Sequence, residues 1–82
     1  LVHMPVKSRV AEALIHLHNK YNPQKETPFI VNISRENLAT IAGTATESLI
    51  RTLSDFREEK LIDIREGVVV ILDEIKLSNM LY

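Results

Sequence analysis

The chain has 82 residues, which is room for one small domain with one hydrophobic core and excludes a second independent fold. Hydrophobic residues make up 45% and charged residues 26%, the balance of a folded domain, and the lack of cysteine excludes disulfides, thiolate metal sites and a cysteine nucleophile. The net charge of −1 argues against nucleic-acid binding by bulk electrostatics, so we expect any such binding to rely on individually placed side chains and to be weak for one copy.

Charge is distributed unevenly along the chain. Residues 1–25 carry four basic residues and one acidic residue, whereas residues 52–76 carry four basic and seven acidic residues. The longest apolar run, Val68 to Leu72, is far shorter than the roughly 20 residues that span a bilayer, and no charged leader precedes an apolar stretch. We therefore expect no membrane contact and a cytoplasmic location, which the lack of cysteine also fits.

A long amphipathic helix is predicted over residues 5–21. Pro5 suits the first helical position, and the residues after it place apolar side chains on one face. These side chains are Val6, Val10, Ala13, Leu14, Leu17 and Tyr21. Residues 22–28 contain two prolines, which end the helix and form a loop, and residues 29–33 are a short β-rich run.

A short helix is predicted over residues 35–42. Ser34 can cap its start, and Gly43 stops it. Its apolar side is formed by Leu38, Ile41 and Ala42.

A second helix follows at once, over residues 45–59. Thr44 and Glu47 fit a capping box, in which a hydroxyl and a carboxylate three residues apart satisfy opposite backbone donors. Two short helices joined through one glycine, with almost no spacer, form a helix-turn-helix rather than an open hairpin.

A β-hairpin and a last helix complete the chain. Residues 61–64 alternate, residues 65–67 turn, and residues 68–72 are β-branched and apolar, so a wing hairpin is predicted over residues 61–72. Asp73 can cap a helix over residues 74–81, whose apolar members are Ile75, Leu77, Met80 and Leu81. The predicted fold class is mainly α with a small antiparallel sheet, a winged helix-turn-helix. We expect one core that includes Leu14, Leu17, Leu38, Leu49, Leu53, Phe56 and Leu61.

The helix over residues 45–59 has an apolar side and a polar side at about 100° per residue. The apolar side, which we expect in the core, consists of Leu49, Ile50, Leu53 and Phe56, and the polar side of Glu47, Ser48, Arg51, Ser54 and Glu58. Arg51 matches guanine O6 and N7, the Glu47 carboxylate can accept from cytosine N4, and Ser48 suits either role. The start of this helix therefore suits reading of adjacent bases in a DNA major groove.

The pair has an ordinary interpretation as well. Glu–Arg pairs four residues apart are common on solvated helices, where they contribute only about 0.2–0.5 kcal/mol. The location favours base reading, because Glu47 and Arg51 lie in the first turns of the second helix of a helix-turn-helix, followed by a wing.

The stretch from Ile33 to Leu72 resembles the DNA-binding domain of the cyclic-AMP receptor protein and FNR (CRP/FNR) family of bacterial transcription regulators. Residues 34–39, Ser-Arg-Glu-Asn-Leu-Ala, match the positioning helix, residues 42–44, Ala-Gly-Thr, the turn, and residues 47–51, Glu-Ser-Leu-Ile-Arg, the recognition helix. Residues 59–62, Glu-Lys-Leu-Ile, lead to the wing, and the helix and proline loop before Ile33 also fit.

The resemblance implies a function and its residues. Glu47 and Arg51 take the family's two base-reading positions and Ser48 a third contact position, in the output domain of a transcription regulator. The residues around the turn are further candidates for DNA contact, and they are Ser34, Arg35, Thr44, Ala45 and Thr46. This sequence departs from the family pattern at two positions. Many relatives have Arg where Thr46 stands, and Ile50 is bulkier than the small residue often found at its position.

The resemblance also implies partners. The full regulator is expected to be a homodimer on a two-fold symmetric operator in double-stranded DNA, with an effector domain and a dimerisation helix before Leu1, so we expect this chain to bind no cofactor or effector. The loop from Asn22 to Thr27 is either a simple connector or, as in the family, a surface for RNA polymerase.

The sequence also allows two other classes of function, an enzyme or metal protein and a protein-docking module. An enzyme or a metal protein is disfavoured, because His16 and His18 lie on different faces of their helix and His3 is remote from both. The stronger alternative is a winged helix that docks on a protein, which the acidic residues after Thr52 favour slightly. A docking helix, however, has no reason to place Glu, Ser and Arg at positions 47, 48 and 51.

Overall fold

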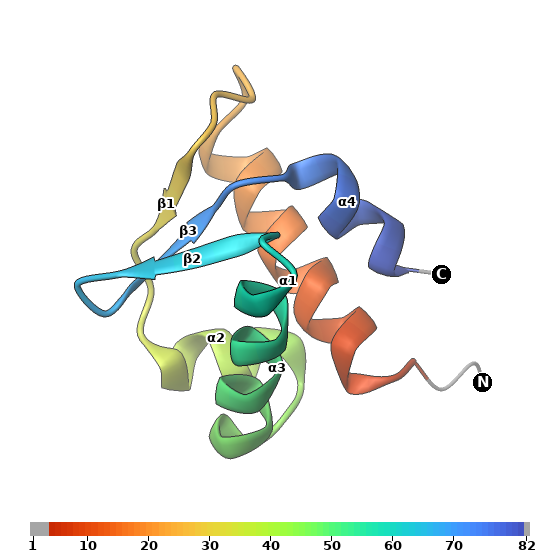
Figure 1. Ribbon diagram of the computed structural model, residues 1–82. Helices are drawn as coiled ribbons and strands as arrows, with labels where there is room; N and C mark the ends of the chain where they lie inside the picture. Colours follow the sequence, from red (N-terminus) through yellow and green to blue (C-terminus); the bar gives the residue numbers. More distant parts are fainter. Residues whose placement is uncertain (1–3, 82) are drawn as a thin grey trace.

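The computed structural model describes residues 4–81, with helix α1 (Val6–Tyr21) at its centre (Figure 1). α1 packs against every other helix and against the first strand, which explains why its buried side is broad and apolar. Pro5 has an extended ψ of 157° and so lies just before the helix, as its N-cap, rather than at the predicted first helical position. Tyr21 was expected on the buried face, but its side chain is 61% exposed because α1 ends there, beyond the elements that cover it.

Helices α2 (Arg35–Ala42) and α3 (Thr46–Glu58) form one end of the molecule (Figure 1). Both pack on α1 and on each other. The bounds of α2 coincide with the predicted range, and α3 begins and ends one residue inside its predicted range. Ser34 caps α2 as expected, since its hydroxyl oxygen accepts from the Asn37 N–H at 3.1 Å.

Three strands form an antiparallel sheet in the order β1-β3-β2. They are β1 (Phe29–Val31), β2 (Ile62–Arg65) and β3 (Val68–Ile71). β1 comes before the two short helices in the chain and β3 comes after them. The pairing of Val31 with Val69 therefore brings together the two segments that flank the helix-turn-helix. β2 and β3 form the wing hairpin within the predicted residues 61–72.

The tip of the wing is a tight turn at Glu66 and Gly67. Both residues have left-handed backbone conformations, with φ of 52° and 77°. Two successive positive φ values match the right-handed twist of the flanking strands, which explains the glycine at the second position. The hairpin thereby keeps β2 and β3 in register from Ile62–Ile71 to Arg65–Val68.

The last two described elements pack against α1. Helix α4 (Glu74–Ser78) is capped by the Asp73 carboxylate, which accepts from the Lys76 N–H at 3.0 Å, and continues as a single 3-10 turn, η1 (Asn79–Leu81). The Ser8 hydroxyl donates to the Met80 carbonyl at 2.8 Å. The predicted α-helix over residues 74–81 is therefore two shorter helical segments. Of its predicted apolar members, Leu77 is buried and Ile75 is exposed.

The core lies between α1, α3 and the sheet. All seven side chains expected there, Leu14, Leu17, Leu38, Leu49, Leu53, Phe56 and Leu61, are buried. The structure is a winged helix-turn-helix, mostly helical with a small antiparallel sheet, as predicted. None of the helices in the described part of the chain is long and apolar enough to cross a membrane.

Candidate nucleic-acid interface

The turn between α2 and α3 is fixed by backbone geometry. Gly43 has a φ of 71°, and the N–H groups of Gly43 and Thr44 donate back to the carbonyls of Thr40 and Ala39. A helix end with a left-handed residue favours glycine, because glycine has no Cβ atom that would clash in this conformation.

The predicted capping box is wrong. Thr44 completes the end of α2, so the last extended residue before α3 is Ala45, which is the N-cap. Within the described chain, no side chain accepts from the first backbone donors of α3 at this cap. The sequence pattern placed the cap one residue early, since the turn needs Thr44 for its own hydrogen bond.

The outward side of α3 carries the predicted base-reading residues. Glu47 and Arg51 are exposed one turn apart, and Ser48 beside them is half-buried. Within residues 4–81, no ion pair or hydrogen bond joins Glu47 to Arg51. The solvated-pair interpretation requires Glu47 and Arg51 to bond to each other. In this structure they do not.

The assignment of Ile50 to the core was wrong, since Ile50 is 51% exposed and lies on the outward side of α3. Ile41, which was placed on the apolar side of α2, is 47% exposed. Thr52, which was not assigned to the core, is buried beside Leu53. The buried arc of α3 is therefore rotated slightly away from Ile50, and it consists of Leu49, Thr52, Leu53 and Phe56.

The further candidates for DNA contact lie at the start of α2 and in the turn before α3, and each has its own structural role. Ser34 is the α2 cap, Thr44 is the last residue of the turn, and Ala45 is the exposed N-cap of α3. Thr46, the first residue of α3, is half-buried. Arg35 donates from its guanidinium to the Gly67 carbonyl at 2.9 Å, which ties the start of α2 to the wing tip.

A second arginine supports the turn from α1. Arg9 donates through Nη1 to the Gly43 carbonyl at 3.0 Å, so α1 holds the joint between the two short helices. Neither Arg9 nor the partner of Arg35 was identified from the sequence. The residues of each pair lie more than 30 positions apart, and a single sequence gives no signal that they meet.

A small charge cluster links the end of α3 to the wing. The Asp63 carboxylate accepts from the Arg65 guanidinium at 3.0 Å and from the Ile64 N–H at 2.8 Å, and lies 3.5 Å from Arg57. The hydrogen bond from Arg65, then that from the Ile64 N–H and the nearby positive charges, lower the pKa of Asp63 below its ordinary value of 3.8. The cluster thus connects β2 to the end of α3 through Arg57.

The histidines have structural or solvated positions. His18 is fully buried, with its ring edge-to-face against Phe29 at 5.3 Å and its Nε2 atom 3.1 Å from the Asn22 amide nitrogen. His16 is exposed, and His3 lies outside the described residues. Among residues 4–81, no three His, Cys, Asp or Glu side chains form a group that suits a metal ion.

The loop before β1 is organised by Asn22. The side chain of Asn22 is buried, donates to the Glu26 carbonyl at 2.6 Å and accepts from the Glu26 N–H at 3.2 Å. Lys25 reaches Glu74 of α4 at 3.3 Å. The loop therefore has a defined shape, with residues 23–28 exposed on the surface.

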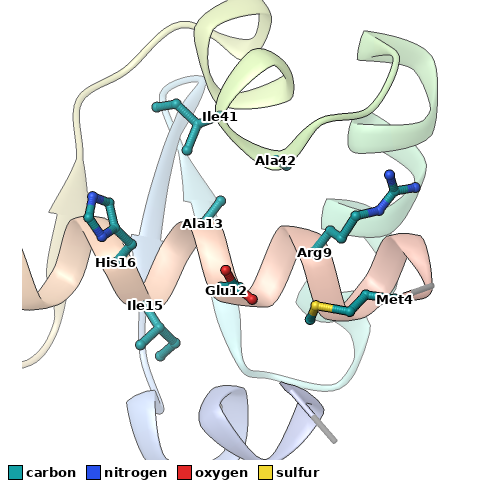
Figure 2. A pocket seen from close by; sticks show the side chains of 8 residues that line it. All are labelled: Met4, Arg9, Glu12, Ala13, Ile15, His16, Ile41 and Ala42. Atoms are coloured by element: carbon teal, nitrogen blue, oxygen red, sulfur yellow. The ribbon is translucent and has the colours of Figure 1, made fainter. Parts of the chain in front are cut away.

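A groove of about 550 Å³ lies between α1 and α2 (Figure 2). Its lining consists of Met4, Arg9, Glu12, Ala13, Ile15, His16, Ile41 and Ala42. It contains none of the outward residues of α3, so the groove and the candidate interface are separate features.

Comparisons with known proteins agree with this geometry. The chain matches the family model of the Crp-like helix-turn-helix domain over residues 8–80. It is also similar to the crystal structure of the catabolite activator protein of Thermus thermophilus, with a TM-score of 0.77 and 26% sequence identity. The match covers 93% of this chain and 33% of that one, so this chain spans about a third of the length of the solved protein. A comparison with curated protein sequences gives no match.

Proposed function

Because the chain belongs to the family of Crp-like helix-turn-helix domains, a family of DNA-binding transcription regulators, we propose that it reads a specific DNA sequence with α3 in the major groove. It is the output domain of a CRP/FNR-type regulator. Glu47, Ser48 and Arg51 make the contacts to bases.

The observation that carries this proposal is the outward side of α3. Glu47 and Arg51 are exposed on the first two turns and make no bond to each other within the described chain. A helix that enters a groove meets base edges with the residues of these turns. Two oppositely charged groups that are free at this position have the chemistry of base reading rather than of a surface ion pair.

The residues have distinct roles. Arg51 donates two hydrogen bonds to O6 and N7 of a guanine, and Glu47 accepts from N4 of a cytosine in a neighbouring base pair. Ser48, which is half-buried beside them, contacts a base or a phosphate. Sequence preference therefore comes mainly from Glu47 and Arg51.

The residues around the turn position the domain on the phosphate backbone. Arg35 retains guanidinium donors beyond the one that binds the wing tip, and Thr44 and Thr46 carry hydroxyl groups. Ser34 and the exposed Ala45 lie in the same region. Contacts of this kind fix orientation on the duplex without reading sequence.

A single copy reads one half-site. We place the chain in a homodimeric regulator on a two-fold symmetric operator, because the net charge of −1 gives one copy little general attraction to DNA. The regulator works in the cytoplasm. The loop from Asn22 to Thr27, in which the buried Asn22 holds the exposed residues 23–27 in shape, is the surface that would contact RNA polymerase.

The proposal is tested by selecting bound sequences from a random duplex library with the chain fused to a dimeric coiled coil. We expect enrichment of a two-fold symmetric sequence and a binding constant that falls as salt rises. Arg51→Ala should lose the enrichment at one base pair of each half-site. If the fusion enriches no sequence and binds all duplexes alike, the protein-docking alternative is the better explanation of the fold.

A further inference from the structure

Ile50 is an apolar side chain on a side of α3 that otherwise carries charged and hydroxyl groups. It is 51% exposed, whereas its neighbours Leu49 and Leu53 are buried. It lies one turn beyond Glu47 and one turn before Ser54, and it immediately precedes Arg51. Ile50 therefore lies among the residues that are proposed to meet base edges.

The exposure of Ile50 is not accounted for by packing within the chain. A β-branched residue has a lower helix propensity than alanine or leucine, and its apolar surface stays in contact with water here. Scattered exposed isoleucines are ordinary on protein surfaces, so exposure alone carries no function. What distinguishes Ile50 is its place beside Glu47 on the first turns of α3, because a helix that enters the groove with these turns brings Ile50 close to the bases.

The chemistry of the groove limits what Ile50 can contact. Its side chain has no donor or acceptor, so against a guanine, a cytosine or an adenine edge it would cover polar atoms without replacing their hydrogen bonds with water. The C5-methyl group of thymine is the apolar group that base pairs present in the major groove. We propose that Ile50 contacts the C5-methyl group of a thymine and is a further specificity-determining residue; this inference rests on the proposed function.

The test removes the methyl group alone. In the duplex selected by the dimeric fusion, each thymine of one half-site is replaced in turn by deoxyuridine, which keeps the base pair and all its polar edges. We expect one replacement to weaken binding of the unaltered protein about fourfold, the effect of losing one buried methyl-sized group. With Ile50→Ala the same replacement should change binding less than about 1.5-fold, and Ile50→Val should keep part of the effect.

Ile75→Ala is the matched control. Ile75 is also an exposed isoleucine, 72% exposed, but it lies on α4 and outside the outward side of α3. For Ile75→Ala, replacement of the thymine by deoxyuridine should weaken binding by the same factor as for the unaltered protein. Circular dichroism melting of both alanine variants checks that they fold, which we expect because both side chains are exposed.

The outcomes separate this inference from the proposed function. A selected sequence whose affinity is unchanged by deoxyuridine at every thymine would overturn the role of Ile50 and leave base reading by Glu47 and Arg51 intact. A penalty that persists in full with Ile50→Ala would also overturn it. If the fusion selects no sequence, the proposed function fails, and the assignment of Ile50 fails with it.

Discussion

Arg51 and Glu47 carry opposite charges on one helix side, so their removal should have different effects on DNA binding. Arg51→Ala is expected to cost about 1–3 kcal/mol on the selected site and to relax preference at one base pair, because a bidentate donor to guanine is lost. Glu47→Ala should leave total affinity unchanged or raise it while discrimination falls, since the carboxylate repels phosphates on every sequence.

Competition binding with the selected site and single-base variants of it measures both quantities. Glu58→Ala, which removes another exposed carboxylate further along α3, is the control for general charge. Equal weakening by Arg51→Ala and Glu47→Ala on all sequences would contradict base reading and favour a positioning role for both residues.

Asp63 gives the wing a stability that depends on pH. Because the pKa of Asp63 in the folded protein lies below its ordinary value of 3.8, its ionised form stabilises the fold above that pH, and this contribution is lost as the pH falls through the folded-state pKa. Asp63→Asn should therefore be less stable than the unaltered protein near pH 7, and the difference should close as the pH falls through the folded-state pKa of Asp63.

Urea unfolding at a series of pH values measures this difference. NMR titration of the carboxyl carbon should also show the pKa of Asp63 rise towards its ordinary value in Arg65→Gln, which removes the main hydrogen-bond donor. A stability difference that stays constant from neutral to acid pH would argue against the charge cluster.

The residues that the sequence misplaced share a physical cause. Tyr21, Ile41, Ile50 and Ile75 all have apolar side chains near the edge of an amphipathic face. Periodicity locates the centre of such a face well, as the seven buried core residues show, but its edges depend on how far the neighbouring element extends.

At the level of elements, α3 joins the core to the candidate interface. Leu53 is 1% exposed on its inner side, so Leu53→Ala should destabilise the fold by about 2–5 kcal/mol through lost burial and a cavity. Chemical denaturation of both proteins measures the change. Ser54→Ala, at the next and exposed position, should stay within about 0.5 kcal/mol. If Leu53→Ala cost no more than Ser54→Ala, Leu53 would not belong to the core.

The elements themselves were largely predictable, and the joints between them were not. Ser34 and Gly43 mark the bounds of α2 because caps are local, one-residue signals. The start of α3 was misplaced, since Thr44 is needed by the preceding turn. The hydrogen bonds from Arg35 to Gly67 and from Arg9 to Gly43 connect the wing to α2 and the turn to α1. They join distant parts of the chain, which local pattern does not encode.

For the whole molecule, affinity should depend on the number of copies. A single chain with a net charge of −1 reads one half-site and is expected to bind feebly at physiological salt. Fusion to a dimeric partner should give tight binding to two half-sites about 10–10.5 bp apart, because the second contact becomes intramolecular. Fluorescence anisotropy with both forms measures the gain. Shifting the half-sites by about 5 bp should remove it, and tight binding of the unfused chain to one half-site would contradict the prediction.

The pairing of β1 with β3 has a consequence for the order of folding. The β2–β3 hairpin and the α2–α3 unit are built from neighbouring residues, whereas Phe29 meets Ile71 only after the whole helix-turn-helix lies between them. Closing that long loop costs chain entropy before any contact is gained, so the β1–β3 pairing should form late, after the hairpin. In kinetic terms, substitutions in β1 should mainly accelerate unfolding, and those in the hairpin should slow refolding. Helix α3 would then be packed on α1 before β1 joins the sheet.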